Sequence, residues 1–95
     1  MEANTSRAVE LLTLIRRLFP AARTEALFVE EDGAARVEVW LDRAHCQVSF
    51  RNDRIAAMDV GRAWDEKYCV GAPVDLDLPT VSAAAEFVGR AFDRI

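Results

Sequence analysis

The stretch that most constrains the fold is Ala35–Leu41, in which apolar and polar side chains alternate over the length of a full strand. Successive side chains of a β-strand point to opposite faces of the sheet, so Val37 and Val39 share one face while Glu38 and Trp40 share the other. This pattern predicts the central strand of a small sheet. Trp40 then falls on the face that should be polar, where a large aromatic ring needs a cover, a partner or a ligand.

Length and composition limit the class of protein. A chain of 95 residues with 52% hydrophobic content is long enough for one domain around one core, so we expect residues 1–95 to form a single domain. The 29% of charged residues is ordinary globular usage and disfavours disordered and membrane classes.

The first residues lack a basic stretch followed by an apolar one, so we expect no secretory signal and a cytoplasmic location. Abundant arginine and alanine indicate a GC-rich, bacterial or phage source.

The charge balance bears on the partner. A net charge of -4 and a pI near 4.9 disfavour direct binding to a phosphate backbone and favour a basic protein partner. Two cysteines, Cys46 and Cys69, are too few for a disulfide framework, and without a signal we expect reduced thiols. We predict no cofactor and no membrane contact.

Two amphipathic helices are expected, one at each end of the chain. Residues 5–19 place Leu11 and Ile15 on an apolar stripe at helical spacing, and Pro20 prevents the helix from continuing. Residues 81–95 repeat that periodicity with many small apolar side chains, and Thr80 can cap their start.

A strand is expected at residues 27–31, before the turn Glu31-Asp32-Gly33. A three-residue loop with Gly33 in the left-handed region would pair Leu27 with Val37 and place both on the core face. A two-residue loop would instead set Leu27 beside Glu38, so we favour the longer loop.

Residues 45–51 alternate as the next strand and end at a tight turn, Asn52-Asp53. A two-residue turn places Phe50 opposite Ile55 and keeps the core face apolar. The same register leaves Met58 and Val60 on the outer side together with Trp40.

Residues 61–79 are long for a structureless connection, so we expect them to contain structure, including a helical turn at residues 62–69. Val74, Leu76 and Leu78 alternate with two aspartates between prolines, as in a short edge strand. We therefore expect an α+β fold: an N-terminal helix, a four-stranded antiparallel meander that a fifth short edge strand can extend, and a C-terminal helix, with the helices packed on the sheet.

Catalytic and metal sites are weakly indicated. His45 and Cys46 are neighbours on a strand and point to opposite faces, so they cannot readily act as a dyad. Cys69 could meet His45 across the fold, but the sequence suggests no orienting third group. The two isolated cysteines and one histidine lack the spacing of a zinc site. Asp75 and Asp77 could hold a hard cation, although charges that protect an edge strand are the commoner explanation. We assign no catalytic and no metal-binding residue.

The leading hypothesis is a small acidic, non-enzymatic module that binds protein. An inhibitor, immunity or anti-defence type protein directed at a basic, for example nucleic-acid-handling, partner has this profile. The alternatives are a homodimeric secretion-chaperone-like or adaptor protein and, ranked lower, a small enzyme that uses His45, Cys69 or the aspartates. The residues expected to contact the partner are Trp40, Met58, Asp59, Trp64, Asp65, Glu66, Tyr68, Asp75 and Asp77.

Overall fold

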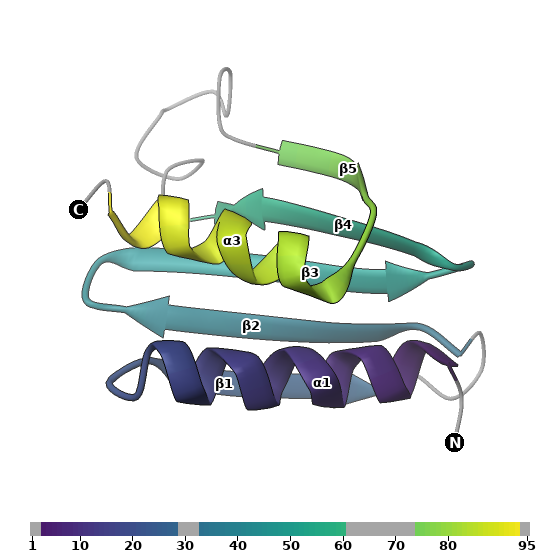
Figure 1. Ribbon diagram of the computed structural model, residues 1–95, viewed down its shortest axis with the longest axis horizontal. Coiled ribbons are helices and arrows are strands. Elements are labelled where there is room, and N and C mark those ends of the chain that lie inside the picture. The colour runs from purple at the N-terminus through teal and green to yellow at the C-terminus, as the bar shows by residue number, and fades with distance from the viewer. Residues whose placement is uncertain (1–2, 29–32, 61–73, 94–95) are drawn as a thin grey trace.

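The computed structural model describes residues 3–28, 33–60 and 74–93, without the side chains of Phe28 and residues 74–76. Within these described ranges, two helices and five strands follow one another in the order expected for an α+β fold (Figure 1). Their bounds are α1 Ala3–Leu18, β1 Arg23–Phe28, β2 Ala35–Leu41, β3 Ala44–Arg51, β4 Arg54–Asp59, β5 Val74–Leu78 and α3 Val81–Phe92. None of the described helices has the length and apolar character needed to cross a membrane.

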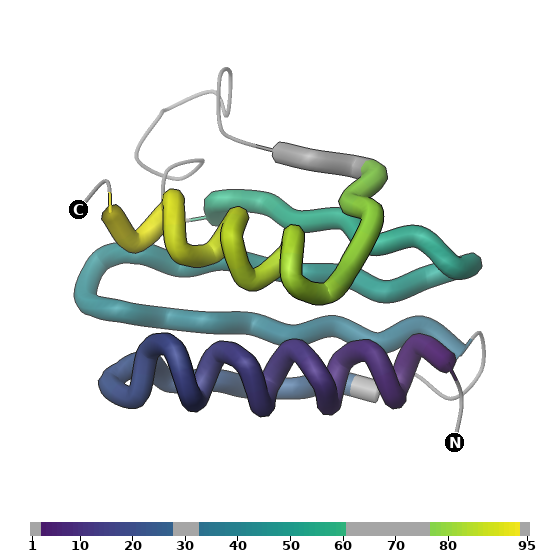
Figure 2. Tube along the Cα trace, in the orientation of Figure 1, coloured from purple at the N-terminus to yellow at the C-terminus, as the bar shows by residue number. Residues whose placement is uncertain are grey.

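The five strands form one antiparallel sheet in the order β1-β2-β3-β4-β5, so the chain runs up and down without a crossover (Figure 2). Both helices pack on the same face of this sheet. Figure 1 shows α1 in front of β1 and β2, and α3 in front of β3 and β4. The fold therefore has two layers, and the described helices cover only one face of the sheet.

The hydrophobic core lies between the helix layer and the covered face of the sheet. Val37, Val39, Val48 and Phe50 are fully buried there, as the alternation along β2 and β3 predicts. The two helices also contact each other. Phe19, just after α1, meets Phe92 of α3 edge to face with ring centroids 5.0 Å apart. This contact closes the core where α1 ends.

The hairpin of β3 and β4 has the expected register. Phe50 pairs with Ile55 and Val48 with Ala57, so the apolar side chains share the covered face. The turn between β3 and β4 holds Asn52 at φ 50° and Asp53 at φ 62°. Positive φ at both central residues is the requirement of a type I′ hairpin turn, and short polar residues tolerate it.

The prediction for β1 was wrong in both its bounds and its register. The strand runs over Arg23–Phe28, and Ala26, not Leu27, lies opposite Val37. Leu27 pairs with Arg36 and points away from the helices with 48% of its surface exposed. The prediction assumed that the largest side chain must face the core. In the structure the small side chain of Ala26 takes that position under α1. Gly33 has φ 69°, the left-handed conformation expected, and residues 29–32 lie outside the described part.

The fifth strand is present and forms an edge of the sheet. β5 pairs with β4, with an irregularity between Ile55 and Ala57, and buries Leu78 while Asp77 stays exposed. Thr80 caps α3 as predicted, because its Oγ1 accepts a hydrogen bond from the backbone N–H of Ala83 at 3.0 Å. The helical turn expected at residues 62–69 lies outside the described residues.

Candidate functional site

The strongest candidate site is the face of the sheet opposite the helices, which we call the outer face. No helix or strand of the described chain lies over it. Its described side chains, assigned by strand alternation and pairing, are Arg23, Glu25, Leu27, Arg36, Glu38, Trp40, His45, Gln47, Ser49, Arg51, Arg54, Ala56, Met58 and Asp77. Trp40 is among them, as the alternation along β2 predicts.

Trp40 is held between two side chains from the neighbouring strands. The guanidinium carbon of Arg23, its partner on β1, lies 4.5 Å from the centroid of the Trp40 ring. His45, its partner on β3, stacks on the ring with centroids 4.7 Å apart and planes 15° apart. Because β2 lies between β1 and β3, the two groups approach from opposite sides. Both faces of the indole are therefore occupied within the protein.

His45 is itself oriented by a carboxylate. Its Nε2 lies 3.2 Å from Oε1 of Glu38, so Nε2–H donates the hydrogen bond. Glu38 precedes Trp40 by two residues on β2 and therefore shares the outer face. The four side chains Arg23, Trp40, His45 and Glu38 form a connected group, which we call the Trp40 cluster. A pre-ordered group of this kind loses little conformational freedom when it contacts a ligand.

Exposed apolar side chains lie on the same face. Leu27 is 48% exposed and Met58 is 38% exposed. Glu38, Gln47 and Met58 occupy one continuous row of paired positions across β2, β3 and β4. The outer face thus combines apolar contact area with charged and aromatic groups, a mixture typical of protein interfaces.

The residues predicted to bind a partner are only partly brought together. Trp40 and Met58 share the outer face, and Asp77 is exposed on the edge strand β5. Asp59 lies on the opposite, covered face with 4% of its surface exposed, so it is out of reach of a partner at the outer face. The other predicted contacts, Trp64, Asp65, Glu66, Tyr68 and the side chain of Asp75, lie outside the described part.

Cys46 is placed as an inert core thiol. It points to the covered face, opposite His45, and is fully buried. Burial, followed by the negative charge of Asp59, raises the pKa of its thiol to about 12. A thiolate is the reactive form of cysteine, so Cys46 cannot serve as a nucleophile near neutral pH. Within the described ranges, no three His, Cys, Asp or Glu side chains gather as a metal site would require.

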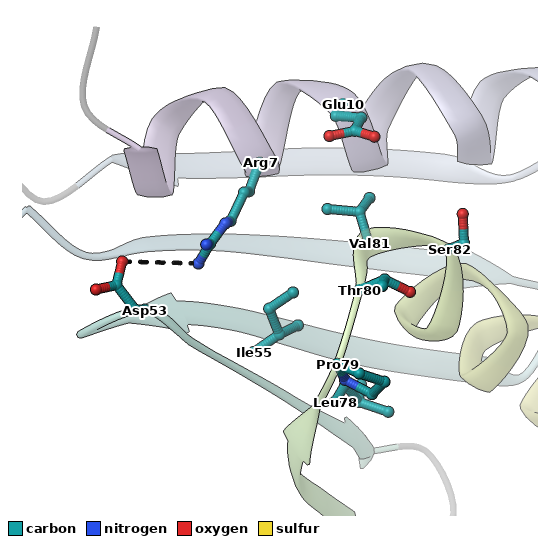
Figure 3. Close-up of a pocket in the computed structure, with 9 residues that line it drawn as sticks. All are labelled: Arg7, Glu10, Asp53, Ile55, Leu78, Pro79, Thr80, Val81 and Ser82. Carbon is teal, nitrogen blue, oxygen red and sulfur yellow. Dashed lines mark ion pairs between the residues drawn. The ribbon is translucent and has the colours of Figure 1, made fainter.

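A second surface feature is an open cleft of about 390 Å³ between α1, the β3–β4 turn and the start of α3. Figure 3 shows Arg7 pointing from α1 toward Asp53, away from Thr80 and Ser82. The ion pair of Arg7 with Asp53 is long, at 3.9 Å, and Asp53 is largely exposed. The polar groups of this cleft do not converge on one point, so it is a weaker candidate than the outer face.

A third feature is a shallow apolar groove of about 290 Å³ between the two helices, lined in part by Leu14, Leu18 and Ala85. The helix layer also exposes Val9 and Leu18, at 42% and 54%. These two side chains are as exposed as Leu27 and Met58 and provide a matched control for the outer face.

The sequence analysis missed Arg23 and Glu38 as members of the site. Glu38 could have been found from the alternation along β2, since it shares a face with Trp40. Arg23 could not, because the three-residue loop favoured from the sequence sets a different register, in which Arg23 does not lie opposite Trp40.

Comparison of the chain with protein-family models, with curated proteins and with solved structures found no match. The function is therefore argued from the site alone.

Proposed function

We propose that this protein is a non-enzymatic module that binds another protein through the outer face. The observation that carries this proposal is that both described helices pack on one side of the sheet, while the other side presents the Trp40 cluster beside exposed Leu27 and Met58. Aromatic and arginine side chains surrounded by apolar contacts are the groups that dominate binding energy at protein interfaces.

The chemistry of the described residues supports binding over catalysis. His45 has an orienting carboxylate in Glu38, but its ring is stacked on Trp40. The adjacent thiol, Cys46, points to the other face and is buried. His45 does not line the cleft beside Arg7 and Asp53 or the groove between the two helices.

The biological class remains the one that the sequence predicts: a cytoplasmic inhibitor, immunity or anti-defence type protein, acting on a partner whose overall charge is basic. The net charge of -4 supports this choice through long-range attraction. A homodimeric chaperone-like or adaptor protein is the second candidate, because an uncovered sheet face can also pair with its own copy.

The test is affinity capture from the source cell with two matched double variants. Leu27→Gln with Met58→Gln removes apolar contacts from the outer face, and Val9→Gln with Leu18→Gln does the same on the helix layer. All four side chains are exposed, so both proteins should remain folded, which circular dichroism checks.

We expect the wild type and the helix-layer variant to retain one partner at stoichiometric yield and the outer-face variant to lose it. Loss of the partner with the helix-layer variant alone, or capture of no stoichiometric partner, would contradict the proposal. Light scattering over a wide concentration range tests the second candidate, the homodimer. That candidate predicts a dimer for the wild type and a monomer for the outer-face variant.

A further inference from the structure

We propose that the outer face receives an acidic segment of its protein partner, with the guanidinium of Arg23 as the anchor for a carboxylate. This inference rests on the proposed function and adds the chemistry of the contact. A partner that is basic as a whole can still present an acidic segment, so the local contact and the long-range attraction are separate properties.

The outer face has the opposite charge balance to the whole chain. The chain carries -4, yet the described side chains of the outer face include four arginines, Arg23, Arg36, Arg51 and Arg54, against three carboxylates, Glu25, Glu38 and Asp77. Charge complementarity across an interface favours a partner surface of the opposite sign. The outer face therefore suits an acidic surface.

The two glutamates do not neutralise Arg23. Glu38 holds Nε2 of His45 at 3.2 Å, and Glu25 lies directly opposite Glu38 in the pairing of β1 with β2. No carboxylate of the described residues forms an ion pair with Arg23. Arg23 is an exposed residue, so a ligand at the outer face can reach it.

Trp40 gives this guanidinium a defined position. The 4.5 Å contact with the ring restrains a side chain that would otherwise be free in solvent. A restrained, planar guanidinium can donate two parallel hydrogen bonds to a carboxylate, and less conformational entropy is lost on binding. His45 supports the arrangement from the other side of the ring.

A nucleic acid is the other polyanion that a basic face could receive, and the geometry disfavours it. Single-stranded nucleic acids bind by stacking bases on open aromatic faces. Arg23 and His45 occupy both faces of Trp40, so no base can stack there. The net charge of -4 also opposes a phosphate backbone. Exposed Leu27 and Met58 suit apolar side chains flanking an acidic residue of a protein segment.

The first test measures fluorescence anisotropy of three labelled probes of equal length, oligoglutamate, oligolysine and oligothymidylate, at physiological ionic strength, where the long-range attraction of the net charge is screened. We expect the full-length protein to bind oligoglutamate more tightly than the other two. Tighter binding of oligolysine or of oligothymidylate, or absence of oligoglutamate binding, would overturn the inference.

The second test compares Arg23→Gln with Arg16→Gln, which removes the same charge from an exposed position on α1 in the helix layer. We expect Arg23→Gln to weaken oligoglutamate binding about tenfold more than the control does, which corresponds to about 1.4 kcal/mol. Arg23→Lys should give an intermediate loss, because it keeps the charge but not the planar fork. Equal effects of the two glutamine variants would overturn the inference.

Failure of this inference is distinguishable from failure of the proposed function. If Leu27→Gln with Met58→Gln removes a captured partner while Arg23→Gln leaves its affinity unchanged, the outer face binds protein but not through an acidic segment. The glutamine replacements at Leu27 and Met58 carry no charge, so they do not perturb the electrostatic test.

Discussion

Replacement of Trp40 by alanine should destabilise the protein by at least about 1–2.5 kcal/mol, because its two stacking contacts are lost together with the burial of a partly covered ring. The ring makes two stacking contacts, with Arg23 at 4.5 Å and with His45 at 4.7 Å. An exposed cation–π contact is worth about 0.5–1 kcal/mol and an aromatic pair about 0.5–1.5 kcal/mol.

Urea unfolding followed by circular dichroism measures this loss, and Trp40→Phe is the control because it keeps an aromatic ring. A double-mutant cycle with Arg23→Ala should give a coupling free energy of about 0.5–1 kcal/mol. A loss well below about 1 kcal/mol would show that the ring makes neither stacking contact. A coupling free energy near zero would show that the stack with Arg23 is not formed. Either result would remove Trp40 and Arg23 from the argument for a binding face.

Two further predictions concern the covered side of the sheet and the start of α3. The pKa of the Cys46 thiol is raised from 9.0 to about 12 in the folded state, so the unfolded chain releases this proton first and the free energy of unfolding should fall as pH rises from about 9 toward 12. The expected loss is about 2 kcal/mol by pH 10.5, measured by urea unfolding. Cys46→Ala should lack this part of the pH dependence, and an identical slope in that variant would refute the assignment. Thr80→Ala should cost about 1 kcal/mol by removing the hydrogen bond to the N–H of Ala83, whereas Thr80→Ser should retain most of the stability, as thermal unfolding can show.

Much of the fold could be predicted because local rules agree with tertiary packing in the middle of the chain. The alternation in β2 and β3 and the two-residue turn at Asn52 and Asp53 together determine the pairing of Phe50 with Ile55. The helices follow from their apolar spacing, with Pro20 after the first and Thr80 before the last. In the hairpin of β3 and β4, one register satisfies both the turn geometry and the burial of apolar side chains.

The register of β1 could not be predicted, because size is a poor guide to which side chain faces a helix. Ala26 takes the covered position and Leu27 the exposed one, the reverse of what hydrophobicity suggests. That reversal also brings Arg23 beside Trp40. The Trp40 cluster was therefore only half predictable: the outward direction of Trp40 follows from the alternation in β2, while its contact with Arg23 depends on the unpredicted register.

The most direct test of the central claim, that the outer face is the binding surface, is hydroxyl-radical footprinting of the protein with and without its captured partner. The method reports the solvent access of individual side chains by mass spectrometry. We predict that Met58, Leu27 and Trp40 become protected in the complex, while Val9 and Leu18 on the helix layer keep their reactivity. Protection of Val9 and Leu18 with unchanged oxidation of Met58 and Trp40 would contradict the claim and assign binding to the helix layer.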